Sequence, residues 1–191
     1  MEAARDAALF QQNFYRSRHG SVPLRRNADL DMLAQMCAYY YQPMGMIDHS
    51  CPYYKSGKNF YFSEADGIGE NGMGGGEGDI YEHLWSNLQM AIWGGWAFNR
   101  ESYKYNFSDF KNAHFLSTGH FTQMIWRETT HFGFGYSVFK KKGKYGAISI
   151  FLYSPAGNVQ SQDGSPYIMN VRPVIPGAKA VRSVNLNDWF F

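Results

Sequence analysis

The chain has 191 residues, a formal net charge of +2 and 18% aromatic residues. This length fits one domain with a sizeable buried core, with room for a terminal extension. The small net charge argues against a nucleic-acid binder, which would need a concentrated basic footprint.

Two apolar stripes predict helices at the start of the chain. The first stripe ends at Gly20 and Pro23, and the second follows a cap at Asn27 or Asp29. The predicted buried faces are Ala3, Ala7, Phe10 and Phe14 in the first helix, and Leu30, Leu33, Ala34, Cys37 and Tyr41 in the second.

Residues 42–78 are rich in Gly and Pro, which predicts irregular structure. The glycine run at 74–78 lacks the Gly-Lys-Ser/Thr ending of a phosphate loop, so we interpret it as a linker. A third helix is predicted to start at Asp79, with Glu82 as a near capping box, and to stop or bend at Gly94-Gly95 before Glu101. Its predicted buried side chains are Leu84, Leu88, Ala91, Ile92 and Trp96.

The second half of the chain predicts strands. After a short helix over 121–126, bulky residues alternate with small ones over 132–138, and an apolar strand follows over 145–153. The basic run Lys140–Lys144 between them predicts a solvated hairpin turn or, second, a contact for acidic phospholipid headgroups. Early helices followed by late strands favour an α+β domain. We expect the domain over 1–176, and 177–191 as a strap or a partner-binding tail.

Four features bear on the compartment. The first residues show no signal peptide, residue 2 is Glu rather than the Gly that myristoylation needs, and no stretch is apolar and long enough to span a bilayer. The two cysteines are too few for a disulfide framework, and the sequence leaves open whether they form one bridge. We expect Cys37 as a reduced core residue and Cys51 as a loop thiol. The expected location is cytoplasmic or peripheral-membrane, or secreted if a leader was removed.

Four ionisable residues lie in unusual local settings: His49, Glu70, Glu101 and His120. His49 lies in an irregular stretch and Glu70 lies between glycines in Gly69–Gly72. His120 follows Gly119 at a predicted helix start, where the helix N-terminus lowers the pKa of an imidazole and favours the neutral form that metals bind.

The motifs around these residues occur in the order of a known family. They are Arg16–Leu24, Asp48–Ser50, Gly69–Asn71, Tyr105–Phe107, Gly119–Trp126 and Tyr153–Asn158. With them the chain resembles the CAP domain of cysteine-rich secretory proteins, antigen 5 and plant pathogenesis-related proteins, over about residues 10–176. The resemblance implies a three-layer α–β–α sandwich with a central antiparallel sheet, and a cleft with a His/Glu tetrad. That tetrad is His49, Glu70, Glu101 and His120.

The disulfide-poor, Golgi-associated branch of this family looks most similar. The chain departs from it in lacking the myristoylation glycine, in the longer segment between Gly69–Asn71 and Glu101, and in the tail after Pro176.

Two imidazoles and two carboxylates suit a divalent cation such as zinc, with the Glu side chains as ligands or as partners that orient the rings. The alternative is a hydrogen-bonded network that holds the irregular loop to the core. The runner-up is a metal-dependent hydrolase, but a helical His-Glu-x-x-His signature is missing. A serine hydrolase has no better support, because no nucleophile elbow surrounds Ser50 or Thr122. The resemblance implies no generally accepted catalytic activity.

We therefore expect a non-catalytic module that binds a lipid or sterol, or a membrane surface. Some members of the family bind such ligands, and Tyr side chains suit a lipid cleft because they are amphipathic. The third hypothesis is a scaffold whose C-terminal tail docks a protein partner. The candidate lipid-binding residues are Tyr53, Tyr54, Phe60, Tyr61 and Phe62.

Overall fold

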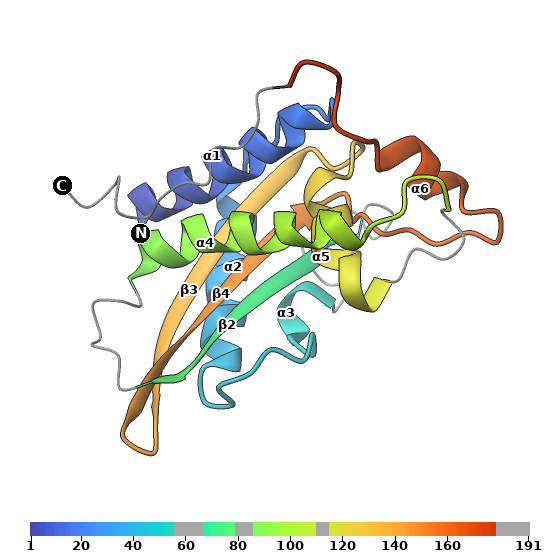
Figure 1. Cartoon of the computed structure of the whole chain (residues 1–191). Coiled ribbons are helices and arrows are strands. Elements are labelled where there is room, and N and C mark those ends of the chain that lie inside the picture. Colours follow the sequence, from blue (N-terminus) through green and yellow to red (C-terminus); the bar gives the residue numbers. More distant parts are fainter. Residues whose placement is uncertain (56–66, 79–85, 110–114, 179–191) are drawn as a thin grey trace.

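The two segments predicted as strands in the second half of the chain form the predicted hairpin. In the computed structural model, β3 (His131–Lys141) pairs antiparallel with β4 (Lys144–Ser154), and their turn lies at Lys142-Gly143. The structure describes residues 1–55, 67–78, 86–109 and 115–178 (Figure 1). The other elements are α1 (Glu2–Arg18), β1 (Arg25–Arg26), α2 (Ala28–Tyr41), α3 (Pro52–Lys55), β2 (Gly69–Gly78), α4 (Asn87–Arg100), the 3₁₀ helix η2 (Glu101–Lys104), α5 (Phe115–Ile125) and α6 (Ser165–Asn170).

The sheet has the order β1-β3-β4-β2 and forms the middle of three layers. Helices α1, α4 and α5 cover one face and α2 covers the other (Figure 1). The predicted α–β–α sandwich is confirmed. The sheet is antiparallel except for the two-residue β1, which pairs parallel with β3.

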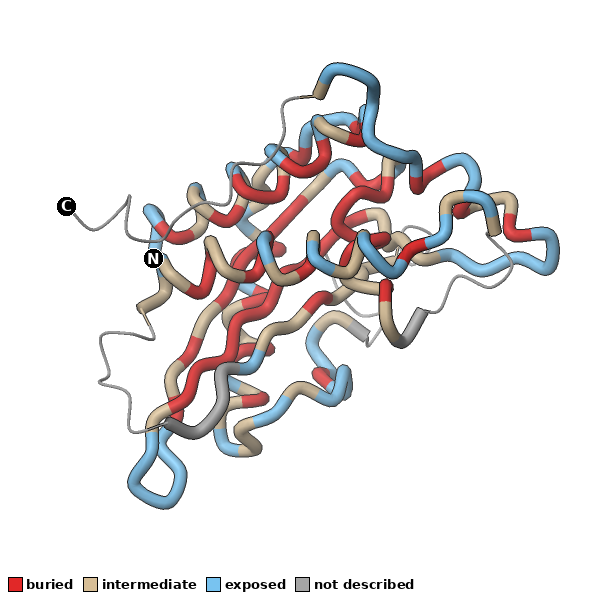
Figure 2. The backbone as a smooth tube through the Cα atoms, in the orientation of Figure 1, coloured by how far each residue is buried: buried red, intermediate tan, exposed pale blue. Residues whose placement is uncertain are grey.

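Both faces of the central strands are buried (Figure 2). The glycines of β3 allow α2 to pack closely on the strand. A Cβ on Gly133 would lie 2.2 Å from the backbone carbonyl carbon of Leu30, and a Cβ on Gly135 would lie 2.1 Å from the backbone carbonyl carbon of Ala34. Helix α2 therefore packs directly on the strand backbone. Its predicted buried face is confirmed, and Asn27 caps the helix.

The predicted buried face of α1 is wrong by about one residue. Phe10 is 63% exposed and Phe14 is also exposed, whereas Gln12 and Arg16 are fully buried. Helix α1 buries polar side chains because they find partners inside. Gln12 accepts a hydrogen bond from Tyr153 (2.8 Å). The Arg16 guanidinium donates to the backbone carbonyls of Val22, Met124, Trp126 and Thr129.

The glycine run interpreted as a linker is part of strand β2, which pairs antiparallel with β4. Backbone pairing needs no side chain, so a glycine-rich segment can join a sheet. Two predictions lie outside the described residues: the near capping box of Asp79 and Glu82, and the burial of Leu84.

The third helix differs from its prediction in start, face and continuity. Helix α4 begins at Asn87 after a capping box of Ser86 and Gln89, and it runs unbroken through Gly94-Gly95. Gly94 faces the Phe151 ring and Gly95 faces α1, so these glycines allow close packing rather than a break. Leu88 and Trp96, predicted to be buried, are exposed.

The cysteine prediction is also wrong: Cys37 and Cys51 form a disulfide with their Cα atoms 5.6 Å apart. Cys51 lies in a loop that folds back on α2, which the spacing along the chain could not indicate.

Just before the predicted strap or tail of 177–191, the Ile175 N–H donates to the carbonyl of Arg18 at the end of α1 (2.8 Å). Residues 179–191 lie outside the described part, so the strap or tail stays a prediction. Within the described residues, no helix combines the length and apolar character needed to cross a bilayer.

Candidate functional site

The first half of the candidate site is a pair between a loop histidine and a buried carboxylate. His49 Nδ1 lies 2.7 Å from Glu70 Oε1. The Glu70 side chain on the edge strand β2 is 1% exposed, whereas that of His49 is 52% exposed. His49 has a left-handed backbone (φ +59°) in the loop closed by the Cys37–Cys51 disulfide. The disulfide therefore helps to hold the ring against β2.

Two tyrosines also bind the Glu70 carboxylate. The Tyr41 hydroxyl on α2 lies 3.1 and 3.3 Å from the two carboxylate oxygens and accepts a hydrogen bond from the Cys51 N–H (2.9 Å). The Tyr54 hydroxyl hydrogen-bonds with Glu70 and Tyr41. Burial, followed by the Glu70 charge for Tyr54, raises the pKa of both phenols. They remain neutral donors that satisfy the buried carboxylate.

The second half of the site is a pair between two consecutive helical elements. His120 Nδ1 on α5 lies 2.7 Å from Glu101 Oε1, and Glu101 Oε2 accepts the Phe121 N–H (3.0 Å). The His120 ring stacks on Phe98, with centroids 5.1 Å apart. His120 lies inside α5, which starts at Phe115, so the predicted effect of a helix N-terminus does not apply. The carboxylate and the stacked ring orient the imidazole instead.

Strand β2 connects the two pairs. Glu70 binds His49, and the next residue, Asn71, donates from Nδ2 to the backbone carbonyl of His120 (2.9 Å). Successive side chains of a strand point to opposite faces, so the pairs flank the edge strand from both sides. Across the described ranges, no three His, Cys, Asp or Glu side chains cluster closely enough to hold a metal ion. Convergence of all four residues on one ion stays a prediction.

Both pairs have the same chemical arrangement. A carboxylate only accepts hydrogen bonds, so Nδ1 of each ring carries the proton and the Nε2 lone pair points away from the carboxylate. Histidines that bind metals usually donate their other N–H to such a carboxylate. The residues therefore fit a cation held by imidazoles, with Glu70 and Glu101 orienting the rings rather than acting as ligands.

The hydroxyl groups near the pairs are engaged elsewhere. Ser50 Oγ donates to Asp48 Oδ1 (2.5 Å). Thr122 Oγ1 is buried among the carbonyls of Thr118 and Gly119 and the side chain of Asn158. These contacts give neither hydroxyl the His partner that would activate it as a nucleophile.

The predicted lipid-binding residues divide into three groups. Tyr53 is exposed and packs edge-to-face on Tyr40, with centroids 6.4 Å apart. Tyr54 belongs to the hydrogen-bond network of Glu70. Phe60, Tyr61 and Phe62 lie outside the described residues.

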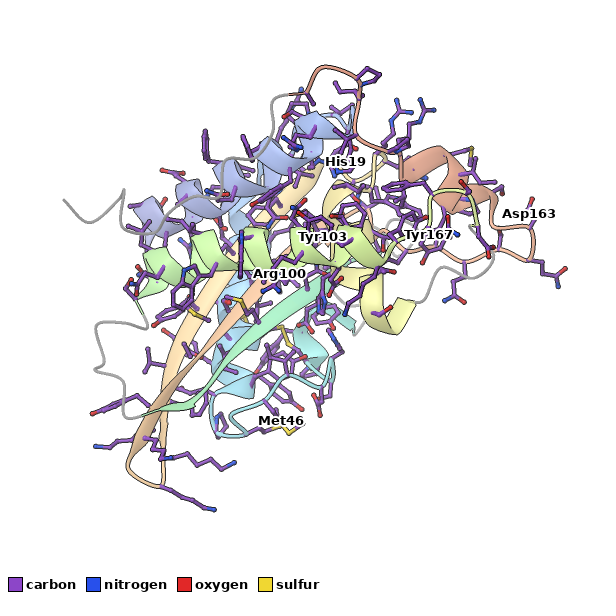
Figure 3. The ribbon with its side chains drawn as sticks, viewed as in Figure 1. His19, Met46, Arg100, Tyr103, Asp163 and Tyr167 are labelled. Carbon is purple, nitrogen blue, oxygen red and sulfur yellow. A yellow bond between two sulfur atoms is a disulfide. The ribbon has the colours of Figure 1, made fainter. Side chains whose placement is uncertain are left out.

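A pocket of about 280 Å³ lies beside the Glu101–His120 pair. Arg100 is labelled in Figure 3, and its guanidinium carbon lies 4.9 Å from the centroid of the Trp96 ring. Trp96, Ala97, Arg100, Glu101 and Lys104 line this pocket.

Comparison with known proteins gives a consistent result. The profile described as "CAP: Cysteine-rich secretory protein family" matches residues 9–153. A probable pathogenesis-related protein of Arthroderma benhamiae is 27% identical over 176 residues, covering 88% of this chain and 48% of the relative. Salivary antigen-5 of Dipetalogaster maximus is 43% identical over 51 residues, covering 27% of this chain and 20% of the relative. The chain thus spans less than half the length of these relatives.

Two solved structures share the fold. BmVAL-1 has a TM-score of 0.61 at 21% identity, covering 85% of this chain and 81% of that chain. NaASP2, whose crystal structure is described as "with Zn2+", has a TM-score of 0.59 at 19% identity, covering 86% and 85%. At such identities the likeness extends to the fold alone.

Proposed function

We propose that this chain, which belongs to the cysteine-rich secretory protein (CAP) family, is a non-catalytic binding module. In this proposal His49 and His120 hold a divalent cation such as Zn²⁺. The observation that carries the proposal is the shared arrangement of the two rings: each Nδ1 lies 2.7 Å from a carboxylate oxygen. Imidazole nitrogens suit zinc, and water can complete the coordination.

Three further observations support this proposal. The rings are partly exposed, with 52% of the His49 side chain and 37% of the His120 side chain accessible, so an ion can reach them. The carboxylates of Glu70 and Glu101 fix the orientation of the rings through the contacts at Nδ1. A relative with the same fold has a crystal structure with Zn²⁺.

Calorimetric titration with zinc chloride at neutral pH tests the proposal. His49→Ala combined with His120→Ala should abolish binding, and Glu70→Gln should weaken it about 10- to 100-fold because the ring loses its anionic partner. The matched control is His131→Ala, since His131 Nδ1 contacts the Thr130 hydroxyl rather than a carboxylate. Unchanged zinc affinity in the double variant would refute the proposal.

A peptidase and esterase screen with and without zinc tests the non-catalytic part. Turnover that disappears in the double His variant would favour the alternative, a metal-dependent hydrolase.

A second candidate function is binding of a lipid or sterol. The exposed Tyr53 and the partly buried Tyr40, which pack edge-to-face, supply amphipathic surface near the first half of the site, since the Tyr40 hydroxyl lies 3.3 Å from Ser50 Oγ. Tyr53→Ser should weaken sterol or phospholipid binding, and Tyr103→Ser, an exposed tyrosine on η2, is the control. Binding should survive loss of both histidines, because apolar area would hold the ligand. Equal binding by Tyr53→Ser and the wild type would remove this candidate.

We also infer an oxidising compartment from the Cys37–Cys51 disulfide, because thiols of cytosolic proteins are kept reduced. This inference favours the secreted alternative over the cytoplasmic one.

A further inference from the structure

The turn between β3 and β4 carries a concentrated positive charge. Lys140, Lys141, Lys142 and Lys144 are all exposed around the tight turn, in which Lys142 and Gly143 have φ values of +50° and +81°. We call this turn the basic tip. Figure 2 shows it as an exposed loop that projects from one end of the sheet.

Among the described side chains, no carboxylate pairs with the lysines of the basic tip. Lys140 Nζ instead lies 4.8 Å from the centroid of the Tyr145 ring and 3.4 Å from its hydroxyl. Between Glu128 and Asp163 the sequence contains no Asp or Glu.

An uncharged turn with an exposed apolar side chain lies beside the base of the hairpin. A Cβ on Gly45 would lie 3.1 Å from the Phe139 ring, so the turn after α2 packs against β3 just before the basic tip. The next residue, Met46, is 58% exposed and is labelled in Figure 3. Residues 32–47 contain no charged residue. The same end of the molecule thus presents lysines and an exposed thioether together.

We propose that this end, the basic tip with Met46, docks on an anionic phospholipid bilayer. The lysine ammonium groups contact the headgroups while their alkyl stems lie along the interface, and Met46 enters the boundary of the acyl region. Tyr145 is suited to the headgroup level because its ring is amphipathic. An anionic polysaccharide or nucleic acid would use the charge of the tip without requiring Met46.

Two physical consequences follow from the proposal. Each basic residue near an anionic membrane strengthens binding about fivefold, so removal of two lysines should weaken it about 25-fold. The attraction should fade with added salt because exposed charges are screened. Met46 lies in the same disulfide-closed loop as His49, but neither it nor the lysines of the tip belong to the His–Glu pairs. The proposal does not depend on the proposed cation site.

Vesicle co-sedimentation tests the proposal. The wild type should bind vesicles of phosphatidylcholine mixed with phosphatidylserine and should not bind phosphatidylcholine alone. Lys141→Gln with Lys142→Gln should weaken binding about 25-fold. Met46→Ser should weaken it further, whereas the control Lys104→Gln, an exposed lysine on η2, should leave it unchanged. These side chains are exposed, and an unchanged melting temperature for each variant verifies folding.

Three results would overturn the proposal. One is equal binding of the wild type and the double lysine variant to the charged vesicles. Another is equal binding to neutral and charged vesicles. The third is a combined result: the double lysine variant loses binding, Met46→Ser binds like the wild type, and the wild type binds heparin as tightly as charged vesicles. That result would assign the tip to a sulfated polysaccharide. The double His variant should bind charged vesicles normally and lose only zinc, so failure of the cation site and failure of this surface are distinguishable.

Discussion

Removing the Cys37–Cys51 disulfide should both destabilise the protein and disturb the candidate site. The two cysteines are 14 positions apart, and both are fully buried. The loop they close contains His49. The Cys51 N–H also donates to Tyr41, whose hydroxyl binds Glu70. Loss of the bridge should therefore loosen the ring that we propose as a cation ligand.

The expected magnitude follows from the length of the closed loop. Closing a loop of about 15 residues in the unfolded chain stabilises the folded state by about 3 kcal/mol. For a domain of this size, 1 kcal/mol corresponds to roughly 2–4 °C in melting temperature. The double variant Cys37→Ala with Cys51→Ala should thus melt roughly 6–12 °C below the oxidised wild type and bind zinc more weakly.

Urea unfolding of the oxidised wild type, the reduced wild type and the double variant measures the effect. Reduction should destabilise the wild type about as much as the double substitution and should leave the double variant unchanged. Thiol counting on denatured, unreduced protein should find no free thiol. Two free thiols, or a stability loss below about 1 kcal/mol, would refute the reasoning.

In urea unfolding, Gly135→Ala should destabilise the protein by about 1–3 kcal/mol or more, because its Cβ would lie 2.1 Å from a backbone atom of α2. The control Gly74→Ala, whose Cβ would have its nearest neighbour at 3.8 Å, should change stability by less than about 1 kcal/mol. Arg16→Met should cost about 3 kcal/mol or more in the same assay, because buried carbonyls lose their donor; no loss would contradict the role of Arg16. Burial lowers the pKa of His19, so as pH falls below about 6.5 the unfolded chain takes up the proton first and stability should decrease. His19→Asn should make the melting temperature fall less steeply as the pH is lowered below about 6.5. A slope of melting temperature against pH equal to that of the wild type would contradict the role of His19.

Several elements could be predicted because their residues obey simple periodicities. Helix α2 buries an apolar stripe that contains Leu30 and Tyr41 and begins after the cap Asn27, so pattern and structure agree. The β3–β4 hairpin shows the two-residue alternation of a strand. The candidate His and Glu residues came from motif order, and the structure gives each His one carboxylate partner.

Other features depend on contacts that a sequence pattern does not contain. Arg16 and Gln12 look like surface residues of α1, yet they are buried because distant carbonyls and Tyr153 bind them. The glycines of β2 resemble a linker until β4 supplies a pairing partner. The apolar stripe of α2 predicts that Tyr41 is buried, but its role in holding Glu70 requires the loop that returns through Cys51.

Anomalous diffraction at the zinc edge from crystals soaked in zinc chloride shows directly whether His49 and His120 hold one ion. We expect one strong peak about 2.0–2.1 Å from Nε2 of both His49 and His120, with Glu70 and Glu101 still bound to Nδ1 of each ring. The peak should be missing in crystals of the double His→Ala variant. A wild-type crystal with no zinc peak near these rings, or with zinc bound only elsewhere, would contradict the account.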